Sequence, residues 1–311
     1  MKTTLKIFCF LLLLLSNFIS GGQNRITDTS ATCIAFWKNG ESRVLQILHG
    51  KEKYDSLKQR SKTTVSYEAH IKIIDSTATG FTIEWIYKNF TSADLNEQSS
   101  GEVNTIMEGL KILYKTDDVG SFSELLNWQE VRDFYFNTLE KSLGSKPENK
   151  ATTSALNQVK AMFQSKENIE AVLIREIQLY HTPYGTEYSL SGETIETALA
   201  NISGGAPFPA KIIIKLNELN TDKDYCNVSL NQTIDKEKAG PIIIDLLKRL
   251  AGSSTKDADI NKKDIENMEI SDLNEFVYSI NTGWLSRVIY KRTATIANTK
   301  QIETYEITEK K

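Results

Sequence analysis

The stretches TTVSYEAHIKIID (residues 63–75) and FTIEWIYKNF (residues 81–90) decide the fold. Apolar side chains alternate with polar ones from Val65 to Ile73 in the first stretch, and from Phe81 to Tyr87 in the second. A period of two, in segments rich in β-branched and aromatic residues, predicts antiparallel strands with one buried face. The short segment STATG (residues 76–80) separates the two strands.

Further strands are predicted on both sides of this pair. CIAFWKNGES (residues 33–42) and SRVLQILHG (residues 42–50) predict a hairpin with its turn at Asn39 and Gly40. AKIIIKLNELN (residues 210–220) and YCNVSLNQTID (residues 225–235) predict a second pair of strands. The tail, residues 270–308, predicts three more strands, with a turn at Asn298 and Thr299.

Helical periodicity appears in three places. Residues 123–144 carry apolar side chains every three or four positions, with Ser123 as a candidate N-cap and Gly144 as a candidate end. A longer helical stretch follows Pro147, and a short helix begins near residue 236 with Pro241 in its first turn. Strands, helices, strands, a helix and strands again predict an α+β fold.

The N-terminus has the three zones of a secretory signal. Lys2 and Lys6 precede an apolar run at residues 7–15, and small residues follow at 20–22. The run is too short for a transmembrane helix, so we expect residues 1–22 to be removed. Residues 23–311 would then form a single α+β domain, exported to the periplasm or secreted, and soluble after cleavage. The polar segment at residues 252–268 predicts either a loop within this domain or a boundary that subdivides it.

The charge balance argues against polyanionic partners. The chain has 37 basic and 40 acidic side chains, and loss of Lys2 and Lys6 makes the predicted mature chain more acidic. Nucleic acid and anionic membrane surfaces attract basic proteins, so we expect neither as a partner.

Two cysteines remain after the predicted cleavage, because Cys9 lies in the signal. In an oxidising compartment Cys33 and Cys226 have one obvious use, which is a disulfide. A bridge across so long a loop would stabilise the fold by about 5 kcal/mol on a chain-entropy estimate. The alternative is two separate buried thiols.

The usual signatures of catalysis and cofactor binding are missing. His49, His70 and His181 have no second ligand at metal spacing, and we expect them to be solvated. A calcium-like start at Asp257 fails at the later ligand positions. Carboxylates such as Glu68, Glu84 and Glu124 would catalyse hydrolysis only if the fold paired them, and outward-facing glutamates are normally solvated. We therefore predict no enzyme, no metal site and no cofactor.

Aromatic side chains offer one candidate binding feature. They either line a ligand cavity for lipid or glycan, or fill the core between sheet and helices, and the core is the expected outcome. The residues are Trp37, Trp85, Tyr87, Trp128, Phe134, Phe136, Trp284 and Tyr290.

Four segments carry a resemblance: WKNGES (37–42), GFTIEWIYKNF (80–90), LKILYKTDDVGSFSELLNW (110–128) and GWLSRVIYKRTATI (283–296). Together they resemble a group of exported proteins of Gram-negative bacteria that have no established function. The order of elements is also similar to that of periplasmic lipoprotein carriers and related lipid-binding proteins. That second resemblance implies a curved, half-barrel-like antiparallel sheet packed against a few helices, with an apolar cavity.

Two hypotheses for function follow. The first is a non-catalytic exported binding or carrier protein for an apolar or amphipathic ligand such as a lipid. The second is a structural or protein-interaction module of the cell envelope, without a ligand cavity, that uses sheet edges and surface patches. An unrecognised hydrolase is a third and weaker alternative.

Overall fold

The computed structural model describes residues 25–56, 58–92, 107–144, 154, 156–157, 160–161, 163–199, 206–251, 268–296 and 298–310. The predicted signal at residues 1–22 lies outside these residues, and so does the polar segment from 252 to 267. The signal, the domain boundaries and the calcium-like stretch therefore stay predictions.

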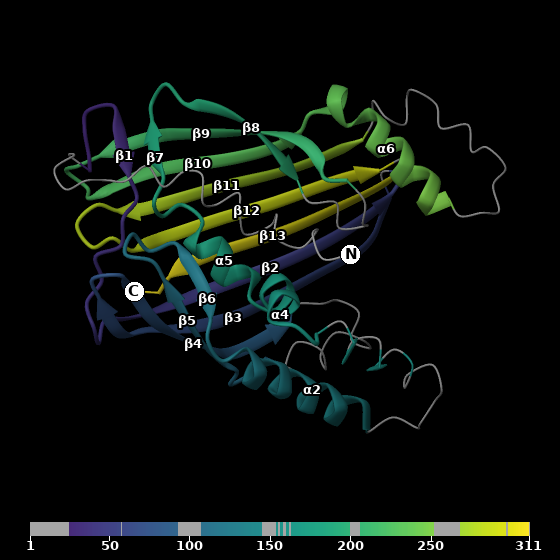
Figure 1. Ribbon diagram of the computed structural model, residues 1–311, viewed down its shortest axis with the longest axis horizontal. Coiled ribbons are helices and arrows are strands. Elements are labelled where there is room, and N and C mark those ends of the chain that lie inside the picture. Colours follow the sequence, from purple (N-terminus) through teal and green to yellow (C-terminus); the bar gives the residue numbers. More distant parts are fainter. Residues whose placement is uncertain are drawn as a thin grey trace.

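One large antiparallel sheet of 11 strands organises the chain, and it does not close on itself (Figure 1). The strand order is β6-β5-β4-β3-β2-β13-β12-β11-β10-β9-β8. Among the described residues, β6 and β8 are thus the two edge strands. The strands are β2 (Ser42–Asp55), β3 (Lys58–Thr77), β4 (Gly80–Ser92), β5 (Lys111–Thr116), β6 (Phe122–Leu125), β8 (Glu193–Leu199), β9 (Phe208–Asn220), β10 (Tyr225–Ile234), β11 (Glu269–Ser279), β12 (Leu285–Ile296) and β13 (Thr299–Glu309).

The sheet consists of two runs of hairpin-connected strands. Strands β2 to β6 follow one another in chain order, and so do β8 to β13. The two runs meet where β13 pairs with β2, with Ile307 opposite Ile47 and Tyr305 opposite His49. The last described strand of the chain therefore joins the two runs by pairing with β2, the first strand of the large sheet in chain order.

The predicted α+β class is wrong, because strands dominate the molecule. Strands account for 57% of the structure and helices for 19%. The described part holds four helices: α2 (Trp128–Gly144), α4 (Lys166–Leu173), α5 (Arg175–His181) and α6 (Lys236–Ala251). The prediction underestimated the strands: β3 alone runs for 20 residues, beyond the alternating stretch that identified it. The antiparallel arrangement itself is confirmed.

The predicted helix from Ser123 begins later than expected. Residues Phe122–Leu125 form the edge strand β6, and α2 starts at Trp128. Asn127 marks the change: its Oδ1 accepts the amide of Leu113 in β5, while its carbonyl accepts the first helical bond from Val131. A single residue thus ends the strand through its side chain and opens the helix through its backbone carbonyl.

The predicted hairpin at residues 33–50 does not form. The turn at Asn39 and Gly40 is present, and Gly40 has a φ of 87°, but residues 33–38 join no strand. Their backbone hydrogen bonds instead go to loop residues that are distant in sequence: Cys33 N–H donates to the Thr186 carbonyl, and Ala35 N–H donates to the Val119 carbonyl. Just before this stretch, β1 (Ser30–Thr32) pairs with β7 (Glu187–Ser189) in a separate two-stranded sheet.

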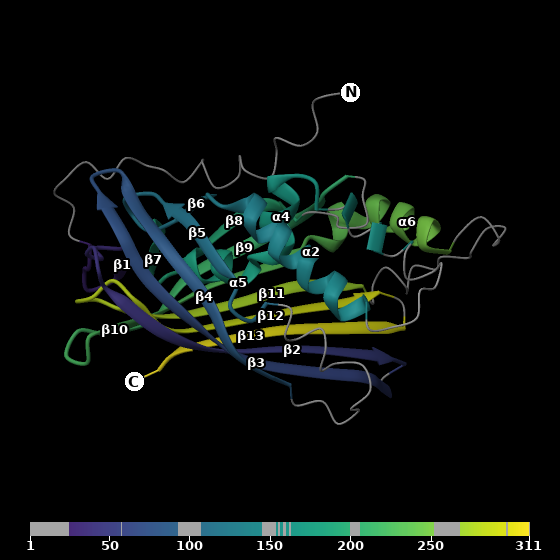
Figure 2. The same cartoon turned by 90° about the horizontal axis from the view of Figure 1, so that it is seen from below.

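The helices lie on one face of the large sheet, which we call the inner face (Figure 1). Figure 2 shows β3 and β4 rising steeply across the nearly level β12 and β13, so that the twisted sheet curls toward the helices. Strands of L-amino acids have an inherent right-handed twist, and this twist accumulates across a large antiparallel sheet. Inner-face side chains of β2 to β5 and β10 to β13 form the main core together with α4 and α5.

A smaller apolar cluster lies beside α6. Phe208, Ile234, Ala239 and Met268 are buried in it. Three half-buried side chains pack against it, namely Leu199, Ile242 and Ile270, and we call the seven residues together the α6 cluster. The molecule therefore has two separate apolar centres.

Candidate functional site

The end of the sheet where β11 stops and β12 starts is filled by aromatic side chains. The rings of Trp37 and Trp284 stack with centroids 4.7 Å apart. Tyr184 and His181 approach Trp37 edge-on, at 5.3 and 5.8 Å. We call these four residues the aromatic end. Aromatic pairs in such geometries stabilise a fold by more than the burial of their apolar area alone would give.

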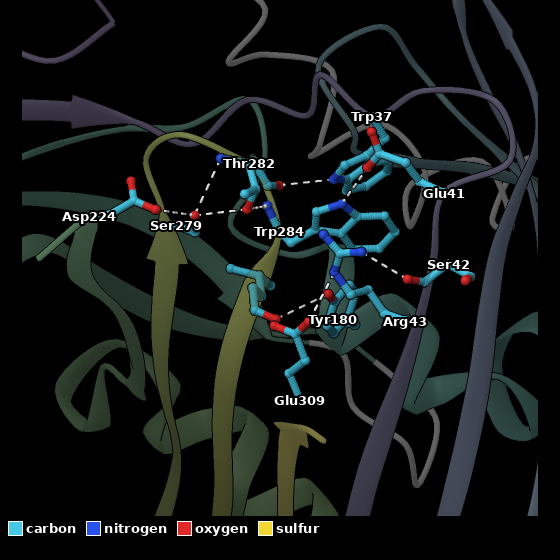
Figure 3. A network of polar contacts seen from close by, with 12 residues as sticks. Trp37, Glu41, Ser42, Arg43, Tyr180, Asp224, Ser279, Thr282, Trp284 and Glu309 are labelled. Carbon is cyan, nitrogen blue, oxygen red and sulfur yellow. Dashed lines mark hydrogen bonds and ion pairs between the residues drawn. The ribbon is translucent and has the colours of Figure 1, made fainter. Parts of the chain in front are cut away.

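Polar groups at the aromatic end are paired as closely as the rings are packed (Figure 3). The Gly283 carbonyl accepts from Trp37 Nε1 at 3.0 Å and from the Tyr184 hydroxyl at 2.9 Å. Trp284 Nε1 donates to Glu41 Oε2 at 2.9 Å. Gly283 has a φ of 72°, and an added Cβ would lie 2.9 Å from the Ile34 carbonyl oxygen, so a glycine is required here.

Two flanking contacts fix this arrangement from outside (Figure 3). The Arg43 guanidinium lies over the Trp284 ring at 4.9 Å and pairs with Glu309 at 2.9 Å. On the other flank, the Asp224 carboxylate accepts from Ser279 Oγ at 2.8 Å. The bonds of Trp37 and Glu41 hold the segment 33–41 against the β11–β12 turn, and this end of the inner face is occupied by the protein's own side chains.

His181 is buried at the aromatic end, so the prediction of a solvated histidine is wrong for this residue. Its Nδ1 lies 2.7 Å from the Gly120 carbonyl and must donate to it, and Nε2 then accepts from the Tyr114 hydroxyl at 2.8 Å. Burial lowers the pKa of His181 to about 4, and the bond to Gly120 only partly opposes this. The ring is therefore a neutral core group with both nitrogens satisfied.

A buried carboxylate lies deeper in the same core. Glu176 of α5 accepts from the Tyr87 hydroxyl at 2.6 Å and from the Tyr67 hydroxyl at 3.1 Å. Burial, and next the charge of Glu176, raise the pKa of both tyrosines well above its usual value. Hydroxyl donors of this kind make a buried carboxylate tolerable. They also fix α5 against β3 and β4.

A row of charged side chains crosses the inner face farther along the same strands. The row runs through residues that are direct register partners: Lys51 opposite Glu303, Glu303 opposite Arg292, and Arg292 opposite Asp272. We call these four residues the charged row. Directly opposite residues in antiparallel strands have neighbouring side chains, so alternating charges in register pair with each other.

Contacts within the charged row are short. Arg292 binds Asp272 through two bonds, from Nε at 2.7 Å and from Nη2 at 2.6 Å. The Lys51 ammonium lies 3.4 Å from Glu303. His49 Nε2 lies 3.1 Å from the same carboxylate, and its ring stacks on Tyr305 at 4.0 Å.

Arg175 of α5 reaches the charged row from the opposite side. It bonds the hydroxyl of Tyr290, and its Nη1 lies 3.9 Å from Glu303. Burial favours the neutral form of Glu303, but the bond from His49 and the charges of Arg175 and Lys51 prevail and lower its pKa to about 2. Together with Arg175, the charged row brings three cations to two carboxylates.

The charged row stays accessible, unlike the aromatic end. The side chain of Arg175 is 29% exposed, that of Arg292 is 25% exposed and that of Lys51 is 64% exposed. Ile270 lies two residues before Asp272 on the inner phase of β11, and it belongs to the α6 cluster. The charged row therefore lies between the main core on one side and the α6 cluster, through its half-buried Ile270, on the other.

The aromatic residues singled out from sequence fill the core, as expected. Trp37, Trp85, Tyr87, Trp284 and Tyr290 are at most 2% exposed. The other three, Trp128, Phe134 and Phe136, pack against the same core from α2.

The structure does not pair the candidate carboxylates with each other. Glu84 bonds Lys111, and Glu124 bonds Lys166, at 2.5 and 3.2 Å. Glu68 accepts from Lys310 at 2.6 Å, from Asn89 and from His70, and these bonds lower its pKa to about 2. In the described part of the chain no group of three or more His, Cys, Asp or Glu side chains is placed to hold a metal ion.

Sequence reasoning missed the charged row. A usable signal existed: Glu303 stands in phase with Tyr305 and Ile307, and Arg292 stands in phase with Tyr290 and Val288. A charge on the apolar phase of an alternating strand marks a polar spot on the buried face. Only the strand register shows that these charges meet.

No protein-family model matches the chain, and a search of curated proteins found no match. None of the helices in the described ranges is both long enough and apolar enough to cross a membrane. The geometry of the inner face is therefore the basis for a functional proposal.

Proposed function

We propose that the protein is a non-catalytic, exported binding or carrier protein for an amphipathic ligand. The ligand's polar group would lie at the charged row, and its apolar part would lie along the α6 cluster. The observation that carries the proposal is the position of the charged row, which leaves an accessible set of cations next to half-buried apolar side chains. A site built from a few polar groups beside apolar ones suits such a ligand.

The charges favour an anionic polar group. Among the described residues, the carboxylates that pair with Arg175, Arg292 and Lys51 are Glu303 and Asp272. Arg292 is held bidentately by Asp272, whereas Arg175 keeps donors beyond its bond to Tyr290 and its long contact with Glu303. Because a guanidinium has five donors in a planar fork, Arg175 is the residue that we expect to bind a carboxylate or phosphate.

Binding can be tested with a fluorescent fatty-acid analogue, after native mass spectrometry has identified what co-purifies with the protein. We expect Arg175→Gln to weaken binding of the analogue by roughly tenfold, the loss of about 1.4 kcal/mol of charge-assisted hydrogen bonding. Arg287→Gln is the matched control, because Arg287 forms an ion pair with Glu306 on the outer face of the same sheet. A wild-type protein that carries no ligand and does not bind the analogue would contradict the proposal.

A second candidate is an envelope interaction module, and the edge strand β8 favours it. Within the described residues β8 pairs only with β9, and most of its side chains are exposed or half-buried. An open edge can accept a strand from a partner protein. Crosslinking in intact cells separates the candidates: a defined protein neighbour captured at β8 supports this one, and co-purifying lipid supports the first.

A further inference from the structure

The two cysteines of the predicted mature chain meet in the core, although they are far apart in sequence. Both are free thiols in the structure, and both are 0% exposed. The Cys33 thiol lies within hydrogen-bonding reach of the Cys226 thiol. The Tyr278 hydroxyl donates to the carbonyl of Ile34, the residue after Cys33, at 2.8 Å. Cys226 is the second residue of β10, where it pairs with Tyr278 of β11.

Cys33 belongs to the segment that covers the aromatic end. It directly follows β1, and its backbone is bonded on both sides, to the Thr186 carbonyl and to the Gly185 amide. The thiol therefore sits where the small β1–β7 sheet meets the inner face of the large sheet. A covalent link at this point would join the start of the described chain to β10 and hold the cover of the aromatic end in place.

We propose that Cys33 and Cys226 form a disulfide, and that the bond is made during folding, before the segment 33–41 packs onto β10. The oxidant is a disulfide, either a small-molecule one or that of a thiol oxidoreductase. One cysteine attacks it as a thiolate and forms a mixed disulfide, which the second cysteine then resolves. The new S–S bond costs the protein two protons and two electrons, and the oxidant's disulfide becomes two thiols.

Burial sets the order of these events. A fully buried thiol cannot be reached by an oxidant, and burial also raises the pKa of Cys33 well above its usual value, which disfavours the reactive thiolate. The same burial protects a bond that has already formed, because a reducing thiolate has no access to either sulfur. Once the protein has folded, the reduced form is therefore slow to form the disulfide, and the oxidised form is slow to lose it.

The first experiment measures the bond in protein exported by cells through its own leader. The sample is unfolded in denaturant with an alkylating reagent and without reductant, and its peptides are then identified by mass spectrometry. We expect a linked Cys33–Cys226 peptide that disappears on reduction, and no alkylation at either residue. Full alkylation of both residues would overturn the proposal; a sample that is first unfolded, then reduced and only then alkylated shows that the labelling is complete.

The second experiment tests the order of events on purified chain. Protein refolded with oxidised and reduced glutathione should contain the bond, whereas protein folded under reductant and then given the same glutathione mixture should stay reduced. The urea midpoint of the oxidised form should exceed that of the reduced form, and Cys33→Ala with Cys226→Ala should abolish the difference. Equally fast bridging of the folded protein would show that the thiols are accessible, and would overturn the proposed order.

Discussion

The aromatic end lies where β11 stops and β12 starts, and the charged row crosses the same two strands farther along, yet the two regions differ in packing and exposure. At the aromatic end, Trp37 and Trp284 stack out of contact with solvent, and every hydrogen-bonding group described there has a partner within the protein. At the charged row, Arg175 and Lys51 stay partly exposed and paired only in part. The comparison shows that strands with the same alternation of side chains can border a packed core at one end and form a polar, accessible surface farther along.

The largest expected effect is on stability at the aromatic end. Trp284→Ala removes a ring that is 2% exposed and that packs on Trp37, so we expect a loss of about 3–5 kcal/mol in the free energy of unfolding. Urea denaturation followed by circular dichroism measures it. A loss below about 1 kcal/mol would show that the aromatic end is loosely packed, and the proposed difference in packing between it and the charged row would be wrong.

The two regions should also differ in their response to acid. His181 has a pKa of about 4 when folded and about 6.5 when unfolded, so only the unfolded chain takes up a proton between these values. Its contribution to stability is complete above about pH 6.5 and is lost as the pH falls to 4, by up to about 3 kcal/mol. Unfolding free energies at several pH values should show this slope in the wild type, and a flatter profile in His181→Gln.

Glu303 of the charged row acts in a lower pH window. Its pKa is about 2 in the folded protein and 4.5 in the reference state, so its contribution is present above about pH 4.5 and is lost as the pH falls toward 2. Glu303→Gln should therefore flatten the profile only below pH 4.5. A change in the window from 4 to 6.5 instead would mean that the two regions are coupled.

The smallest effect is expected from Arg175. Its side chain is partly exposed and its ion pair with Glu303 is long, so Arg175→Gln should lower the free energy of unfolding by about 1 kcal/mol or less. Urea denaturation provides the check, beside Arg287→Gln, which removes a more exposed ion pair on the outer face. A loss of 3 kcal/mol would assign Arg175 to the core and not to an accessible site.

The amino-acid sequence predicted most of the strands but not the balance between strands and helices. Alternation from Val65 to Ile73 identified β3, because period two is a local property of an extended chain. The segment 33–38 also looks extended, and it is, but its backbone bonds go to Thr186 and Val119 and not to a neighbouring strand. Local pattern shows that a segment is extended, and it does not show which partner satisfies its amides and carbonyls.

The candidate site was the least predictable part. The histidine that looked solvated, His181, is held in the core by Tyr114 and Gly120, which are distant in sequence. The residues of the charged row come from four strands, and Arg175 reaches them from a helix. None of these residues forms a motif with its sequence neighbours. No local signal encodes such a set, because it is assembled by register.

By itself, the sequence determined that this chain builds antiparallel strands with one apolar phase, and it placed two cysteines that had the option to pair. Tertiary structure alone decided that β13 joins β2, that the charges of β2, β13, β12 and β11 meet in one row, and that Cys33 lies against Cys226. The physical reason is the range of the forces involved. Side-chain alternation acts between neighbours along the chain, whereas register and layer packing depend on the free energy of bringing distant segments together.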